Sequence, residues 1–191
     1  MAHPLFAAVH AADLAQVDAL LAGGATADPR DDDGATPLMH AAHAGDLDLV
    51  KRLLDSGADP RAADARGWTA LAKAAYNAEL DRGHPDVARA LIDAGADVEA
   101  CIGYGIRPLM LAAGYGEAAV VQVLLQAGAD VTARNEGGLT ALMMVKEKFY
   151  VDVINLLYEA EREAGLGEGA CSSKHPPGAS VITFRKPARS T

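Results

Sequence analysis

Apolar residues recur along this chain at the spacing of short amphipathic helices, and glycines separate one helix from the next. The most regular stretch begins at Thr36, a residue suited to cap a helix, with Pro37 at the first helical position. A second helix follows Gly45 and carries apolar residues at positions 47, 50, 53 and 54, which share one face. Gly57 predicts a left-handed residue just after that helix ends. The pattern therefore predicts two helices joined by a tight turn.

This two-helix pattern is written several times in the sequence. Glycines precede the first helix at positions 34, 67, 105 and 138, with separations of 33, 38 and 33 residues. Gly-Ala pairs that follow the second helix begin at 24, 57, 95 and 128, and they keep the same separations. Two landmarks with one period and one shared five-residue insertion indicate stacked structural repeats. The insertion falls in 76–82, where it lengthens either the first helix of the third copy or the loop that follows.

These copies resemble ankyrin repeats. The resemblance is carried by Thr36-Pro37-Leu38, Ala41-Ala42, Gly45 and Gly57-Ala58-Asp59. It implies an all-α ankyrin-repeat solenoid, made of helix-turn-helix units joined by β-hairpin-like loops (here called fingers), over residues 1–164. The five units span about 1–30, 31–63, 64–101, 102–134 and 135–164, and the first and last are degenerate.

One position departs from the ankyrin pattern. In that family a histidine typically follows Thr-Pro-Leu, whereas this chain has apolar residues there. They are Phe6, Met39, Ala72, Met110 and Met143. The threonine–histidine hydrogen bond that the resemblance implies is therefore absent, and we expect apolar packing to replace it.

The two ends of the chain differ from its middle. His3-Pro4-Leu5 stands where the threonine motif would begin, and the last unit ends in polar residues 159–163 instead of Gly-Ala-Asp. A polar ending is typical of a terminal cap, whose outer face meets water. From Gly165 the composition changes to Gly, Ser, Pro and Lys, which predicts a flexible basic tail over 165–191. Within it, residues 180–184 have strand propensity and could dock on the repeats.

Charge and composition narrow the class of partner. The net charge is −9 and the tail carries +3, which leaves −12 for residues 1–164. An acidic body disfavours nucleic acid, whose phosphates need Lys and Arg, and suits a basic protein partner. The sequence has no apolar run long enough for a membrane span, no recognisable signal peptide, and no metal-type spacing of Cys101 and Cys171. We therefore expect a cytoplasmic monomer that binds neither nucleic acid nor membrane.

Residues suited to catalysis or metal binding are sparse. The sequence has no phosphate-binding loop, nucleophile elbow or Cys-x-x-Cys motif. His40 and His43 share one helix and Asp46 is nearby, but a zinc site needs three or four ligands, so ordinary polar residues are the simpler interpretation. We predict no enzyme activity, no cofactor and no metal.

By the same resemblance, a protein partner binds the concave surface formed by the fingers and the first helix of each unit. Aromatic and apolar side chains of units three and four are predicted to cluster there, and exposed clusters of this kind mark interaction sites. The alternative is that Trp68 and Tyr104 only stiffen adjacent fingers. The acidic run 31–33 would attract a basic partner or is simply a solvated turn. The predicted binding residues are Asp32, Asp33, His43, Arg66, Trp68, Tyr76, Tyr104, Ile106, Tyr115 and Leu139.

The charge contrast between body and tail supports a second hypothesis. The chain would be a regulatory inhibitor or scaffold subunit whose basic C-terminal tail occupies the concave surface until a partner displaces it. This hypothesis predicts that deletion of residues 165–191 raises the affinity for the partner.

Overall fold

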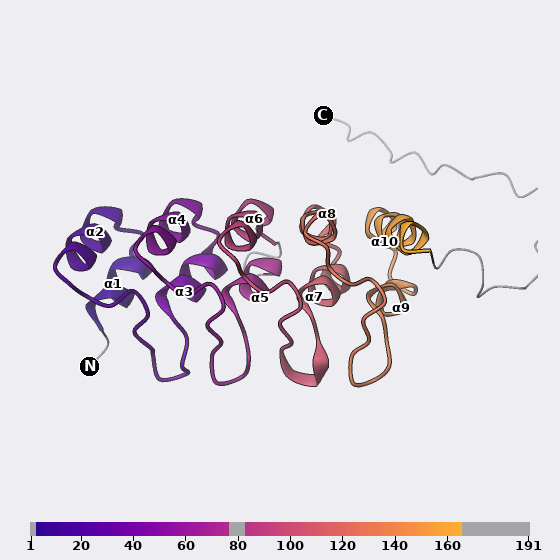
Figure 1. Ribbon diagram of the computed structural model, residues 1–191, viewed down its shortest axis with the longest axis horizontal. Coiled ribbons are helices and arrows are strands. Elements are labelled where there is room, and N and C mark those ends of the chain that lie inside the picture. Colours follow the sequence, from indigo (N-terminus) through magenta and orange to yellow (C-terminus); the bar gives the residue numbers. More distant parts are fainter. Residues whose placement is uncertain (1–2, 77–82, 166–191) are drawn as a thin grey trace, which may run out of the picture.

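The structure, a computed structural model, describes residues 3–76 and 83–165. Within these ranges the chain forms ten α-helices in five pairs, and a finger precedes each pair after the first (Figure 1). The helices are α1 (Pro4–His10), α2 (Leu14–Ala22), α3 (Pro37–Ala44), α4 (Leu47–Asp55), α5 (Ala70–Ala75), α6 (Pro85–Asp93), α7 (Pro108–Tyr115), α8 (Ala118–Gln126), α9 (Ala141–Val145) and α10 (Val151–Glu163). A short 3-10 turn, η1 (Gly103–Gly105), lies in the finger of unit four.

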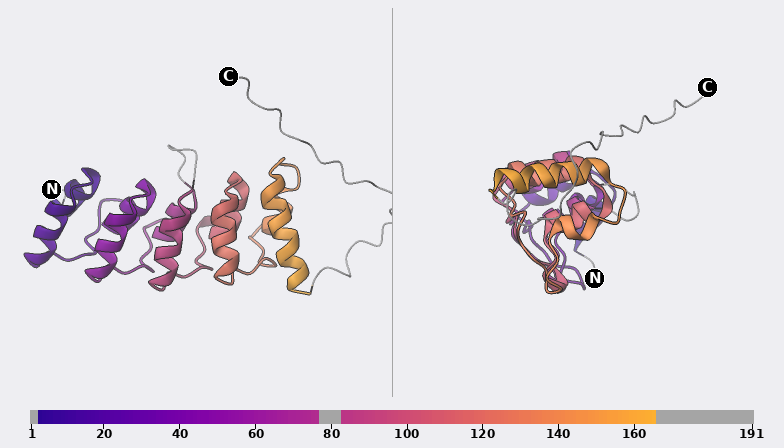
Figure 2. Two further views of the ribbon diagram at one scale, coloured as in Figure 1. Left: turned by 90° about the horizontal axis from the view of Figure 1, so that it is seen from above. Right: turned by 90° about the vertical axis from the view of Figure 1, so that its right-hand side faces the viewer.

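The helices form two rows. The inner row is α1, α3, α5, α7 and α9, and the outer row is α2, α4, α6, α8 and α10, with each helix packed on the next in its row. Figure 2 shows the rows stacked in register, with the fingers projecting together from one side of the helices. Buried apolar side chains of all five pairs merge into one core that runs from Leu5 to Leu157. The all-α solenoid implied by the resemblance is therefore confirmed.

The helices of unit two begin and end where the sequence predicts. The Thr36 hydroxyl accepts a hydrogen bond from the N–H of Met39, and Pro37 is the first residue of α3. Gly45 ends α3 with φ +75°, a left-handed conformation that only glycine adopts at little cost. Gly57 follows α4 with φ +87°. The turn between α3 and α4 is short, so the two helices pack back to back.

Apolar packing replaces the family's histidine in four of the five units. Phe6, Met39, Ala72 and Met110 are all buried. Met39 also supplies a weak acceptor, because its sulfur lies 3.5 Å from the backbone nitrogen of Thr36. Met143, in the last unit, is exposed instead.

Two predictions fall wholly or partly outside the described residues. The insertion of unit three includes residues 77–82; α5 ends at Ala75 and Tyr76 is extended, so the described part of this helix is not lengthened. The basic tail, its strand-like residues 180–184 and its suggested place on the concave surface lie in 166–191. Within the described ranges, the structure contains no helix with the length and apolar character needed to span a membrane.

Candidate protein-interaction surface

The fingers of units two, three and five each have a side-chain acceptor at their base, whereas unit four has Ile102 at that position. In unit two, Asp31 Oδ1 accepts hydrogen bonds from the N–H of Asp33 at 3.0 Å and from that of Ala35 at 2.8 Å. Asp64 makes the matching pair of bonds in unit three, and the Asn135 side chain accepts one in unit five. These residues therefore fix the turn of the finger before they can take part in any binding.

Two pairs of neighbouring fingers, those of units two and three and those of units four and five, are joined through their backbones. The N–H of Ala65 donates to the carbonyl of Asp33 at 3.1 Å, and the N–H of Glu136 donates to the carbonyl of Tyr104 at 3.0 Å. The fingertips therefore form a row in which these two pairs are each bonded together. We call this row, together with the exposed side of the inner helices, the inner surface. Its side chains keep a set order along the array.

A chain of polar contacts links the finger of unit two to unit one. On α3, His40 places Nε2 2.8 Å from Asp31 Oδ2. The other ring nitrogen, Nδ1, lies 3.2 Å from Nε2 of His10, the last residue of α1. His10 and His40 line a hollow of about 460 Å³ together with His43 and Lys73. These polar side chains therefore lie around a recess whose lining also includes Val9, Met39 and Leu49.

Asp31 is held in its charged form. Burial by itself would raise the pKa of this carboxyl group, but the hydrogen bonds with His40 and with the N–H groups of Ala35 and Asp33 lower the pKa overall. Asp31 bonds to its own finger through one oxygen and to α3 through the other. The carboxylate therefore connects the finger to the helix behind it.

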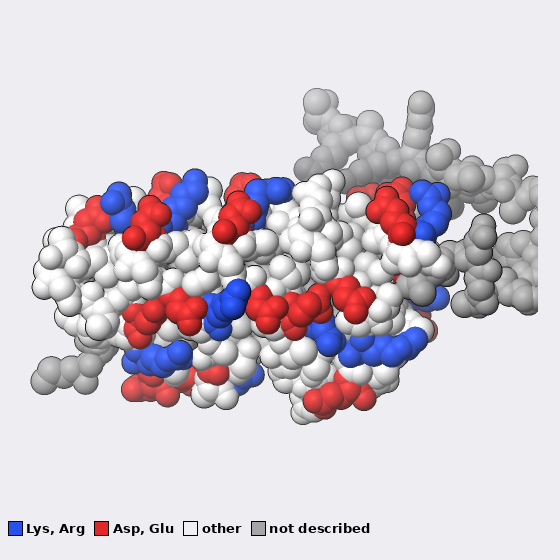
Figure 3. Space-filling model, in the orientation of Figure 1, with Lys and Arg blue, Asp and Glu red and all other residues white. Residues whose placement is uncertain are grey.

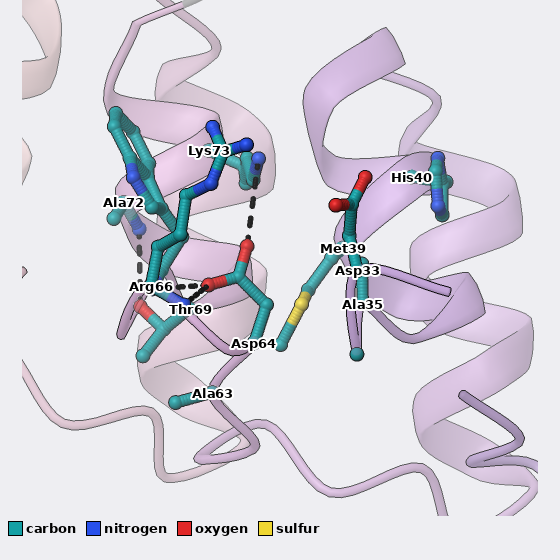
Figure 4. Close-up of polar contacts among 12 residues, drawn as sticks. Asp33, Ala35, Met39, His40, Ala63, Asp64, Arg66, Thr69, Ala72 and Lys73 are labelled. Atoms are coloured by element: carbon teal, nitrogen blue, oxygen red, sulfur yellow. Dashed lines mark hydrogen bonds and ion pairs between the residues drawn. The ribbon is translucent and has the colours of Figure 1, made fainter. Parts of the chain in front are cut away.

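Unit three repeats this arrangement with a lysine. Lys73 takes the place on α5 that His40 takes on α3, and its Nζ lies 3.9 Å from Asp64 Oδ2 (Figure 4). The same ammonium group lies 5.0 Å from the centre of the Trp68 ring, which is a cation–π distance. Trp68 is half-buried. Its ring is thus partly an element of the finger and partly open to a partner.

The finger of unit four presents an aromatic ring to solvent. Tyr104 lies in η1 and is 81% exposed. Its φ is +62°, a left-handed conformation that is uncommon for a residue with a side chain. Ile106, two residues later, is half-buried and packs against the core. Packing does not explain an exposed ring on a strained backbone, and such strain concentrates at functional sites.

At the helix side of the inner surface, two tyrosines from adjacent units stack. Tyr76 follows α5 and Tyr115 ends α7, and their ring centres lie 3.6 Å apart with the planes 2° from parallel. Unit five reaches the same region through Lys148, whose Nζ donates to the carbonyl of Gly114 at 2.6 Å and lies 5.8 Å from the Tyr150 ring. An aromatic stack therefore connects units three and four here, and a hydrogen bond connects units four and five.

The predicted binding residues fall into three groups on this surface. Exposed on the fingers are Asp32, Asp33, Arg66, Tyr104 and Leu139. Half-buried on the fingers are Trp68 and Ile106. At the helix side are His43, Tyr76 and Tyr115. That these residues bind a partner stays a prediction.

Sequence reasoning missed two contributors to this surface. His10 stands 33 residues before His43, so it shares the register position of a residue already assigned to the inner surface. That spacing could have placed it beside unit two. Tyr150 offered no such signal, because it lies beyond α9 in the degenerate last unit.

Two features of the described residues bear on metal binding and on the role of His40. His40 is engaged at both ring nitrogens, by Asp31 and by His10, so neither nitrogen is directed at an open position for substrate. Within 3–76 and 83–165, no three His, Cys, Asp or Glu side chains are grouped so that they could hold a metal ion.

The charged side chains do not gather by sign on the face shown in Figure 3, where acidic and basic residues are interleaved in rows along the array. Several carboxylates join one unit to the next. Asp28 Oδ2 accepts from the N–H of Asp59, and Glu99 Oε1 accepts from the N–H of Asp130, each at 2.9 Å. The acidic excess therefore serves partly to connect units, which weakens the case for a single acidic surface that selects a basic partner.

Comparison with known proteins adds one finding. A sequence model of ankyrin repeats, three copies long, matches residues 5–102 and 81–166. The two matches together span all five helix pairs. No curated protein matches the chain.

Proposed function

Because the chain belongs to the ankyrin repeat family, we propose that it is a non-catalytic module that binds a protein partner through its inner surface. Ankyrin repeats generally mediate protein–protein interactions. The single observation that supports a site on this chain is Tyr104, whose ring is exposed while its backbone is held in a left-handed conformation. A purely structural role would bury the ring, so its exposure favours contact with a partner.

Tyr104 lies on a surface suited to recognition. Exposed Leu139 follows on the finger of unit five, and the Tyr76–Tyr115 stack supplies aromatic area at the helix side. Aromatic residues of this kind are common anchors of protein interfaces, because they provide large contact area with few rotatable bonds. The fingers of units four and five, which carry Tyr104 and Leu139, are bonded to each other, so a partner loses little affinity to ordering them.

Affinity capture with the full chain as bait tests the proposal. Proteins captured from a cell lysate by the wild type are compared with those captured by Tyr104→Gly. Glycine removes the ring and also accepts the left-handed conformation, so the finger should fold at least as well as in the wild type. We expect the recovery of the true partner to fall by about tenfold or more, the effect of losing one interface anchor.

A matched control separates this surface from the rest of the molecule. Tyr158→Ala removes an exposed tyrosine from α10, outside the inner surface, and should leave capture unchanged. Tyr115→Ala should reduce capture as Tyr104→Gly does. Full capture by both Tyr104→Gly and Tyr115→Ala would show that the partner binds elsewhere and would overturn the proposal.

A further inference from the structure

Two apolar positions of the outer helices change from half-buried to exposed at the last unit. Val151 and Tyr158 of α10 hold these positions, and they are 61% and 51% exposed. The equivalent residues of units one to four are all half-buried. They are Leu14, Leu47, Pro85 and Ala118 at the position of Val151, and Leu21, Leu54, Ile92 and Leu125 at that of Tyr158. No helix pair follows α9 and α10 within the described residues, so this side of α10 meets no further pair there.

The inner helix and the finger of unit five show the same change. Met143 is 43% exposed, whereas the residue at its position is at most 5% exposed in every earlier unit. In unit two, Arg30 donates from Nη1 to the carbonyl of Ala63, at the base of the next finger, at 2.6 Å. Arg134 holds the position of Arg30 in the finger of unit five, and its Nη1 lies 3.6 Å from the Met143 sulfur, a weak acceptor. Both arginines also donate to a carbonyl of their own finger. The Arg134 guanidinium is therefore placed to receive a further backbone carbonyl.

These exposed residues form one surface at the C-terminal end of the array, along which α10 lies (Figure 2). On α10, Val151, Asn155 and Tyr158 are spaced by four and three residues, so they share one side of the helix. We define the end face as Arg134, Met143, Val151, Asn155 and Tyr158, all of which are exposed. The polar residues 159–163, expected from the sequence to form a cap, leave this surface open.

The charge of α10 favours one kind of occupant. Asp152, Glu159 and Glu163 form an exposed acidic row beside the end face. Together with Glu161 and Arg162 they give the helix four carboxylates against one guanidinium. Two copies of this helix would repel each other, whereas a segment that combines apolar side chains with Lys or Arg would be attracted.

A segment of this composition follows α10 in the sequence. Residues 181–184 are Val-Ile-Thr-Phe, and Arg185 and Lys186 come directly after them. Residues 166–180 connect this segment to α10 and can span at most about 50 Å, whereas the 13 residues of α10 are about 20 Å long. The segment can therefore reach any part of the end face. Because both belong to one chain, the effective concentration of the segment there is about millimolar.

We propose that residues 181–186 cover the end face of their own chain. The apolar residues of this segment pack on Val151 and Tyr158, and Arg185 and Lys186 lie beside the acidic row. Its β-branched and aromatic residues favour an extended backbone, which presents carbonyls at regular intervals. One of these carbonyls accepts from Arg134, as the carbonyl of Ala63 accepts from Arg30.

This arrangement differs from the second hypothesis drawn from the sequence, in which the basic tail occupies the concave surface. Val151 and Tyr158 belong to the outer row of helices, away from the fingertips. A segment that covers them leaves the inner surface of units two to four open. The inference therefore holds or fails independently of the proposed function.

Paramagnetic relaxation enhancement on the full chain locates the segment. A nitroxide is attached at Ser180→Cys, next to the segment, after Cys101→Ser and Cys171→Ser have removed the other thiols. We expect the amide signals from Val151 to Tyr158 to lose most of their intensity, and those of α2 to keep theirs. A mixture of spin-labelled chains with separate isotope-labelled chains should show no such loss, because the contact is within one chain.

Variants of the end face provide the control. Val151→Lys with Tyr158→Lys removes the apolar surface and repels the basic residues, so the loss of intensity should disappear. Tyr104→Lys, a matched change at an exposed finger residue, should leave it unchanged. Far-UV circular dichroism checks that each variant keeps its helices. Hydrogen exchange of the α10 amides should become about tenfold faster in Phe184→Ser, with no change in α2.

A charge exchange tests the contact with the acidic row. Arg185→Glu with Lys186→Glu should weaken the docking and reduce the loss of intensity. Adding Asp152→Lys with Glu159→Lys restores opposite charges and should restore the effect. Failure of the second pair to rescue the first would overturn the charge arrangement.

Three other outcomes overturn the proposal. Loss of intensity around Tyr104 and Tyr115 would place the segment on the inner surface instead. Loss of intensity in the mixture of separately labelled chains would show that the segment joins two chains. If no helix is affected more than another, the segment does not cover the end face.

Discussion

Units two and three differ from units four and five at the same two positions of the repeat, one at the base of the finger and one on the inner helix. In units two and three these positions hold Asp31 with His40 and Asp64 with Lys73. In units four and five they hold Ile102 with Leu111 and Asn135 with Met144. The first half of the inner surface is therefore charged, and the second half is largely apolar.

The fold permits this difference because a backbone hydrogen bond closes each described finger at this position, whatever side chain stands there. The N–H of Asp31 donates to the carbonyl of Ala35 at 3.0 Å, and the N–H of Ile102 donates to the carbonyl of Ile106 at 2.9 Å. Every described finger contains the equivalent bond. The side chains at these positions can thus change from charged to apolar while the finger keeps its shape. One scaffold therefore presents two kinds of chemistry along a single surface.

The largest expected effect on stability comes from the glycines that join the two helices of a unit, Gly45 in unit two and Gly116 in unit four. A methyl group on Gly45 would overlap the buried His84 ring, whereas one on Gly116 would lie 2.9 Å from the partly exposed Tyr150 ring, which has room to move. Both glycines have positive φ. We expect Gly45→Ala to lower the free energy of unfolding by about 3–4 kcal/mol and Gly116→Ala by about 2 kcal/mol. Urea unfolding followed by circular dichroism measures both.

Gly57→Ala is the control for these two variants. Gly57 has φ +87° but no atom within 4 Å of the added methyl group, so only the backbone penalty of about 1 kcal/mol remains. If Gly45→Ala cost no more than Gly57→Ala, the turn of unit two would be looser than its structure indicates.

A smaller effect concerns the charge on Asp31. Its pKa is lowered in the folded chain, so its contribution to stability is present above the unfolded pKa of about 4 and is lost as the pH falls through the folded pKa. Asp31→Asn should reduce the free energy of unfolding at pH 7 by about 1 kcal/mol and should reduce its decline between about pH 5 and pH 2. Urea unfolding across this pH range measures both changes.

Asp130→Asn sharpens this test in the second half of the array. The pKa of Asp130 is also lowered, mainly by the hydrogen bond from the Thr132 side chain. Asp130→Asn should likewise reduce the decline of the free energy of unfolding as the pH falls. Only Asp31→Asn should shift the NMR signals of the His40 ring. Unchanged His40 signals in Asp31→Asn would contradict the contact between the two residues.

The smallest expected effect on stability comes from Lys73→Met, which gives unit three the residue type that unit five has at this position, Met144. Lys73→Met removes the contact with Asp64 and the cation–π contact with Trp68, so we expect a loss of about 1 kcal/mol or less. Trp68 is the only tryptophan in the chain, so its fluorescence reports on this finger alone. Quenching by acrylamide should increase in Lys73→Met and not in Lys51→Met, a control on the exposed side of α4. Equal quenching in both would mean that Lys73 does not cover the ring.

The sequence was sufficient for most of the fold because the repeat restates the same local signals. Thr36, Gly45 and Gly57 each act through hydrogen bonds within their own unit, and Pro37 acts through its own fixed φ. A period of 33 residues shows where these signals recur. The burial of Met39 and Met110 also followed, since an apolar residue at a register position inside the stack has only the core to face.

Contacts between units were harder to predict. Tyr76 and Tyr115 were both assigned to the binding surface, but their stacking depends on how units three and four are placed around an insertion. Side-chain directions, which the period does not determine, also decide two other contacts. They are the position of Lys73 over the Trp68 ring and the contact of His10 with His40. Cytoplasmic localisation stays a prediction.

The first helix pair is weakly anchored by its outer helix, so the array is expected to open from its N-terminal end. In α2 only Val17 is buried, so the first unit depends on unit two for most of its stability and should exchange its amide hydrogens fastest among the helix pairs. Local unfolding of that unit would release His10 from His40 and leave the Tyr76–Tyr115 stack of units three and four intact. Fraying at one end would thus alter the charged half of the inner surface while the apolar half keeps its structure.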